Sequence, residues 1–169
     1  MRKHVLWRLT FPALFWVVPA VVSFAQPAND ECINAIPLNN VSNWCSTAAQ
    51  FTTVGSTPSA QATPSCFPTT SAVNDVWFSF VAQANTVNIS IAGTVPVNPG
   101  GNISNPQYAL YSGTCNNLTQ IDCVSDAMND NIVQSFASQL IIGQTYYIRV
   151  SARFAFRGHH GRSHRGHRS

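Results

Sequence analysis

The residues that could do chemistry are unevenly placed along this chain of 169 residues. Residues 26–152 contain no histidine and no lysine, and Arg149 is the single basic residue among them. A serine or cysteine nucleophile needs an imidazole to take its proton, and a lysine nucleophile needs a lysine. These kinds of catalysis are therefore excluded within this segment, which leaves carboxylates and cysteines to consider.

Four aspartates lie in the part of the segment that reads as strands: Asp75, Asp122, Asp126 and Asp130. Two facing carboxylates could hydrolyse a glycoside, although the sequence does not show which of them face each other. The last three lie close to Asn129 and Asn131, and such an oxygen-rich loop is typical of a calcium site. The same residue types are also common where a chain simply turns between strands. Both interpretations stay open at this point.

Five cysteines follow residue 25: Cys32, Cys45, Cys66, Cys115 and Cys123. Zinc sites use close pairs such as C-x2-C with further Cys or His partners, and the shortest spacing here has seven intervening residues. Disulfides are therefore predicted, as in other exported proteins. Cys115 and Cys123 flank a strand–turn–strand pattern, which predicts a bond between them. Cys45 with Cys66 is the next expected pair, which leaves Cys32 unpaired or bonded to another chain.

Aromatic residues offer another kind of binding surface. Trp77, Tyr108, Tyr111 and Tyr147 are candidates for an exposed aromatic face, because strand alternation does not bury every aromatic side chain at once. The alternative is that most of them belong to the core or to cross-strand pairs.

Short segments rich in β-branched and aromatic residues would position these groups. The expected strands are 75–82, 86–92, 107–112, 118–123, 132–136 and 145–151, with a weaker one at 48–53. Residues 86–92 alternate, with Val87, Ile89 and Ile91 on one face. Residues 145–151 alternate as well, which places Arg149 on the outward face. No stretch has a helical period of useful length, so we expect an all-β fold, an antiparallel jelly-roll or CUB-like β-sandwich stapled by disulfides.

The N-terminal residues 1–25 have the pattern of a secretory signal peptide. A basic start precedes the apolar run Leu9–Val22, and Ser23-Phe24-Ala25 forms a small-residue cleavage site before Gln26. The run is shorter than the ~20 residues that span a bilayer, so no membrane span is expected after cleavage. Residues 26–152 are then expected as a secreted or cell-surface β-sandwich domain.

The C-terminal residues 153–169 contain five arginines, four histidines and three glycines, and no apolar residue follows Phe156. Such a composition predicts a disordered tail. The net charge of +3 comes from the two ends of the chain, because six acidic residues accompany Arg149 between them. This distribution argues against a nucleic-acid partner, which would need basic charge on the folded surface.

Five blocks in order carry a family resemblance: Pro27–Leu38 (PANDECINAIPL), Asn74–Phe80 (NDVWFSF), Ala109–Cys115 (ALYSGTC), Asn117–Cys123 (NLTQIDC) and Gly143–Val150 (GQTYYIRV). Together they resemble a secreted β-sandwich domain of bacterial proteins exported by the type IX secretion system. That domain is similar to CUB-like and pre-peptidase C-terminal sandwiches. The resemblance implies a non-catalytic extracellular module, usually one of several domains in a larger protein, and it implies no particular ligand.

The chain departs from this resemblance after Val150. In the family a final strand with a last cysteine follows, and such a strand could be bonded to the first strand through Cys32. Here the basic tail stands in its place, which suggests a truncated or frameshifted product. A native tail that binds polyanions and a histidine-rich metal tail are the alternatives.

Two functions are compatible with the sequence. The first is a non-catalytic module for adhesion, ligand binding or accessory support, with a surface glycan or protein as partner and no cofactor unless the aspartate loop binds calcium. The second is a small secreted hydrolase that uses the aspartates.

Overall fold

The computed structural model describes residues 25–67, 74–94 and 103–153, and within them the chain forms short strands and two short 3-10 helices. The elements are η1 (Cys32–Asn34), β1 (Ile36–Leu38), η2 (Val41–Asn43), β2 (Asp75–Val81), β3 (Thr86–Ala92), β4 (Pro106–Thr114), β5 (Asn117–Ser125), β6 (Ile132–Ser138) and β7 (Thr145–Ala152).

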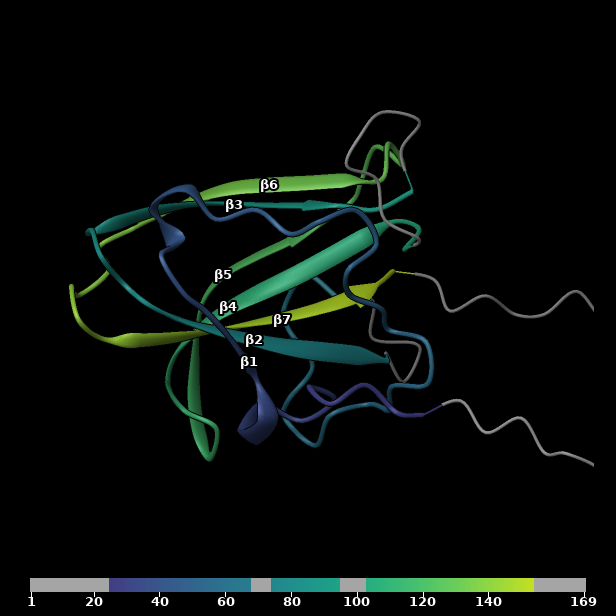
Figure 1. The fold of residues 1–169 in the computed structure, drawn as a ribbon, viewed down its shortest axis with the longest axis horizontal. Helices are drawn as coiled ribbons and strands as arrows, with labels where there is room; N and C mark the ends of the chain where they lie inside the picture. The colour runs from purple at the N-terminus through teal and green to yellow at the C-terminus, as the bar shows by residue number, and fades with distance from the viewer. Residues whose placement is uncertain (1–24, 68–73, 95–102, 154–169) are drawn as a thin grey trace, which may run out of the picture.

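The strands form two sheets of unequal size. The larger has the order β1-β2-β7-β4-β5, and the smaller pairs β3 with β6. Figure 1 shows β3 and β6 lying together above the larger sheet. All described pairings are antiparallel except that of β1 with β2. The all-β sandwich that the sequence predicts is confirmed.

Six of the predicted strands appear within a few residues of their expected positions, and 86–92 matches β3 at both ends. The weaker prediction was wrong, because residues 48–53 lie in a segment of turns and irregular backbone. Ala49 there adopts a φ of 52°, which strands do not contain. The sequence also gives little sign of β1, a three-residue strand with Pro37 at its centre. Its edge position accommodates that proline.

The main core lies between the two sheets. Inward side chains of β2, β4 and β7 meet those of β3 and β6, and the buried set includes Phe78, Leu110, Ile148, Ile89 and Val133. The predicted inward alternation of β3 is confirmed for Ile89, which is buried, while Val87 and Ile91 pack against the same core.

The other face of the larger sheet is covered as well. Trp77, Ala109 and Tyr111 form a second buried cluster with Cys32 and Phe67 from the segments that precede β2. The predicted solvent exposure of the second face of β7 was therefore wrong. Arg149 is 3% exposed, because this outer layer closes over the sheet.

Both disulfides lie beside this second cluster, and the predicted pairings were wrong. Cys32 is bonded to Cys115 and Cys66 is bonded to Cys123, while Cys45 is free. Cys115 and Cys123 do not pair with each other because the β4–β5 register places Ala109, not Cys115, opposite Cys123. Cys115 and Cys123 instead each bond to a cysteine of the covering segments, so the two disulfides attach the outer layer covalently to the sheet.

Two of the predicted segments fall largely outside the described residues. The signal peptide prediction concerns residues 1–25, of which 1–24 are not described, and the tail prediction concerns 153–169, of which Arg153 alone is described. A search of the described residues finds no helix with the length and apolar character needed to cross a membrane.

Candidate ligand-binding cavity

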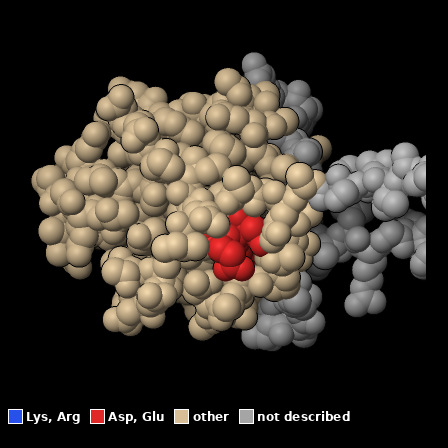
Figure 2. Space-filling view, turned by 60° about the horizontal axis from the view of Figure 1, so that its bottom comes forward, with Lys and Arg blue, Asp and Glu red and all other residues tan. Residues whose placement is uncertain are grey.

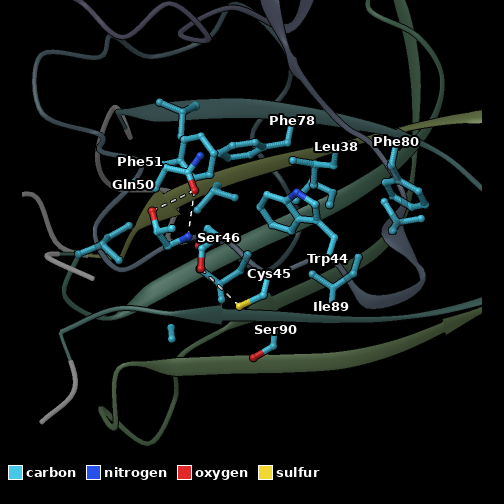
Figure 3. A pocket seen from close by; sticks show the side chains of 18 of the residues that line it. Leu38, Trp44, Cys45, Ser46, Gln50, Phe51, Phe78, Phe80, Ile89 and Ser90 are labelled. Atoms are coloured by element: carbon cyan, nitrogen blue, oxygen red, sulfur yellow. Dashed lines mark hydrogen bonds between the residues drawn. The ribbon is translucent and has the colours of Figure 1, made fainter. Parts of the chain in front are cut away.

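A cavity of about 410 Å³ opens between the two sheets at the β3 edge of the sandwich. Its walls come from the inward face of the larger sheet, from β3, and from the loop of residues 41–53. Figure 1 shows this loop, in blue, rising from β1 and then running alongside β3. Figure 3 shows from close by the side chains that line the cavity.

The cavity follows from the unequal sheets. Among the described strands, β3 pairs with β6 alone, so its other edge faces the loop. The two-stranded sheet leaves part of the apolar face of β1, β2 and β7 without a strand above it. Leu38, Phe78 and Val150 from that face line the cavity opposite Ile89 and Ile91.

Two aromatic side chains of the loop, Trp44 and Phe51, line the cavity. Trp44 and Phe51 stack with ring centroids 6.3 Å apart, and Phe51 meets the buried ring of Phe78 edge-on at 4.8 Å. Trp44 is 40% exposed, whereas Phe51 is half-buried. Phe51 thus anchors the loop to the core, and Trp44 stays partly exposed to solvent. Figure 3 shows both rings among the side chains that line the cavity.

Uncharged polar groups accompany these rings. The Gln50 side-chain oxygen accepts hydrogen bonds from the Thr47 amide at 2.9 Å and the Thr47 hydroxyl at 3.3 Å. The free Cys45 thiol donates to the Ser46 carbonyl at 3.4 Å. Asn88 and Ser90 border the cavity at the β3 edge, with their side chains on the opposite face of the strand from Ile89. None of the described lining residues carries a charge. This surface suits an uncharged ligand.

The three aspartates of the expected cation loop are engaged separately. Asp122 accepts hydrogen bonds from Tyr108 and Ser135. Asp126 accepts three backbone N–H groups of its own loop, from Met128, Asn129 and Asn131. Asp130 accepts the Ile132 amide at 3.1 Å. The contacts of Asp126 and Asp130 are those of turn-forming residues, whereas Asp122 lies within β5 and bonds to side chains of β4 and β6. No group of three or more His, Cys, Asp or Glu side chains suited to a metal occurs in the described ranges.

The fourth aspartate belongs to a buried ion pair. Arg149 donates to Asp75 Oδ2 from Nε at 2.8 Å and from Nη2 at 2.6 Å, and its Nη1 reaches the Ala62 carbonyl at 3.0 Å. Burial raises the pKa of Asp75, and bonds from Ser59 and the charge of Arg149 partly oppose that shift. The pair connects the covering loop to the sheet. Neither Asp75 nor Arg149 lines the cavity.

The aromatic residues singled out from the sequence are mostly interior. Trp77, Tyr108 and Tyr111 are buried and Tyr147 is half-buried, so the first three belong to the interior, as the core alternative has it, and not to an exposed aromatic face. They belong to the most deeply buried strands, β2 and β4. Sequence reasoning missed Trp44 and Phe51, because it looked for aromatics on strands. A tryptophan within the polar run Asn43-Trp44-Cys45-Ser46 was the available signal.

Charge is sparse on the described surface. The face in Figure 2 is almost entirely uncharged, with acidic atoms gathered in one small area and no basic side chain in view. Of the two arginines in the described residues, Arg149 is buried and Arg153 is half-buried.

Comparison with known proteins places this fold in a family. The family described as galactose binding domain-like, associated with the type IX secretion system, matches residues 28–162. The association with type IX secretion that the sequence suggested is confirmed, and the family is galactose-binding-like where the resemblance pointed to CUB-like and pre-peptidase C-terminal domains.

No curated protein and no solved structure matches the chain. Modules of the matching family are typically non-catalytic binding domains, and the association with this secretion system, together with two disulfides, indicates a secreted or cell-surface protein. Because the match spans most of its length, the chain belongs to the galactose binding domain-like family associated with type IX secretion.

Proposed function

We propose that this protein is a non-catalytic glycan-binding module of an exported surface protein, and that it takes the sugar at the mouth of the cavity beneath residues 41–53. The observation that carries the proposal is Trp44, a residue that is 40% exposed and whose ring is stacked on Phe51 beside uncharged polar side chains. A sugar ring has one apolar face that stacks on an aromatic ring and hydroxyls around its rim that need neutral hydrogen-bond partners.

The polar groups at the mouth supply such partners. Gln50, Ser46 and Thr47 lie on the loop. Across from them, β3 turns Ile89 and Ile91 toward the cavity and Asn88 and Ser90 toward its opposite face, so the loop side chains would supply the partners of the sugar hydroxyls. The family description supports galactose or a galactoside as the first ligand class to examine.

The arrangement of carboxylates does not favour the alternative of a hydrolase. Asp75 is buried against Arg149 on the outer face of the larger sheet, and Asp122 is held by Tyr108 and by Ser135 of β6 between the two sheets. Neither lines the cavity. A glycosidase needs two carboxyl groups on either side of one scissile bond.

Isothermal titration of the secreted protein with methyl β-galactoside tests the proposal, with methyl α-mannoside as the comparison sugar. Trp44→Ala should weaken binding about tenfold or more, because aromatic anchors carry much of the energy of such contacts. Phe136→Ala is the matched control, since Phe136 is a 63% exposed aromatic that does not line the cavity.

An unchanged affinity in Trp44→Ala, with folding verified by circular dichroism, would show that the sugar binds elsewhere. An equal loss in Phe136→Ala would mean that the effect is not specific to the mouth.

A further inference from the structure

The interior of the cavity has a different chemistry from its mouth, and we infer that it receives an apolar chain attached to the sugar. The ligand class is then an amphiphilic glycoconjugate, with its sugar at Trp44 and an alkyl or acyl group between the sheets. This inference rests on the proposed function, because it concerns the same site.

The inner walls are apolar on both sides. Val76, Phe78 and Ile148 form one wall, and Ile89 and Ile91 of β3 form the other. A sugar hydroxyl placed between these walls would lose its bonds to water without gaining a partner, which is unfavourable. A chain of methylene groups has no such requirement and gains from leaving water.

The volume of the cavity is large enough for a bound ligand. Protein interiors are close-packed and contain few voids larger than a water molecule. A cavity of about 410 Å³ is far larger than such a void, and it lies within the range of roughly 300–1,000 Å³ that small-molecule sites occupy. Trp44 and Cys45, which line the cavity from the loop, are exposed, so a ligand can leave its polar end in solvent there while its chain lies inside.

Three aromatic rings in contact connect the mouth of the cavity to its interior. Trp44 stacks on Phe51, and Phe51 in turn meets Phe78 in the inner wall. The aromatic path therefore runs from the exposed indole to the buried core. A sugar on Trp44 with a chain passing Phe51 would contact both parts at once.

Titration with methyl, hexyl and octyl β-galactoside, each below its micelle-forming concentration, measures the contribution of the chain. Full burial of each added methylene should tighten binding roughly fourfold until the cavity is filled. Ile91→Phe, which places a larger ring in the wall, should flatten this dependence. Ile121→Phe makes the same change at an exposed position of β5 outside the cavity and should leave it intact.

Cys45 provides a second readout that needs no cavity variant. It is the free cysteine, it is exposed, and it lines the cavity. Saturating octyl β-galactoside should slow its alkylation by iodoacetamide at least several-fold, whereas saturating methyl β-galactoside should slow it less.

The outcomes separate the two proposals. If the methyl and octyl galactosides bind equally, the inference is overturned and the proposed function stands. If octanol binds as tightly as octyl galactoside, the cavity takes apolar chains but the sugar contributes nothing, and the proposed function fails. If none of these compounds binds, both are overturned.

Discussion

At the scale of residues, burial decides what each polar side chain can do. Arg149 and Asp75 lie in the interior, where an unpaired charge is strongly unfavourable, and the pair satisfies both. The Arg149 guanidinium also lies 5.5 Å from the centre of the Trp77 ring. Tyr111 shares this layer, yet its hydroxyl has no hydrogen-bond partner among the described residues.

That hydroxyl makes Tyr111→Phe an informative change. Burial raises the pKa of Tyr111 above its ordinary value of 10.0, and the charge of Arg149 partly opposes the shift. Below pH 10 the folded and unfolded chains both hold the proton, so the contribution of this group to stability is fully present. Above pH 10 the unfolded chain loses the proton first, and stability falls as pH rises through the folded pKa.

We predict that Tyr111→Phe leaves stability at pH 7 unchanged or raises it by up to about 1 kcal/mol, because no hydrogen bond is lost. The variant should also lose less stability between pH 9 and pH 11 than the wild type, and urea unfolding across that range measures both effects. A loss of 2 kcal/mol or more at pH 7 would show that the hydroxyl has a partner after all.

At the scale of elements, disulfides fix the outer layer on the larger sheet. Cys32–Cys115 closes a separation of 83 residues and Cys66–Cys123 one of 57. Bonds that close loops of this size contribute roughly 4 kcal/mol each in the chain-entropy model.

Peptide mapping of the secreted protein under non-reducing conditions should find Cys32 joined to Cys115 and Cys66 joined to Cys123. Iodoacetamide should label Cys45 in the native protein. A peptide that joins Cys115 to Cys123, or Cys45 to Cys66, would contradict this arrangement.

The pattern of neighbouring residues in the sequence predicted the strands well. It predicted poorly which cysteines pair and which charged side chains are buried. Alternation in 86–92 and the aromatic run of β2 are local features, and the structure has both strands. The partner of Cys32 lies 83 residues away, so its identity depends on how β4 pairs with β5 and on which segment covers them. The burial of Arg149 depends on the same covering layer, which the pattern of residues 145–151 does not reveal.

At the scale of the whole molecule, the unequal sheets create the site. Five strands face two, and the uncovered part of the larger sheet is bridged by residues 41–53 instead of a further strand. The sequence predicted the sandwich but not this imbalance, because the pairing order of strands is set by tertiary contacts. The cavity, its aromatic mouth and its free thiol all lie at the edge where the smaller sheet ends.

The most direct test of this account is to map where a galactoside binds by ¹H–¹⁵N correlation spectra of the secreted protein titrated with methyl β-galactoside. We predict that the shifts concentrate on the Trp44 indole N–H and on the amides of residues 41–53 and 87–92. Shifts confined to the loops around Met128 or Ile142, or no shifts at saturating sugar, would contradict the claim that the cavity beneath residues 41–53 is the binding site.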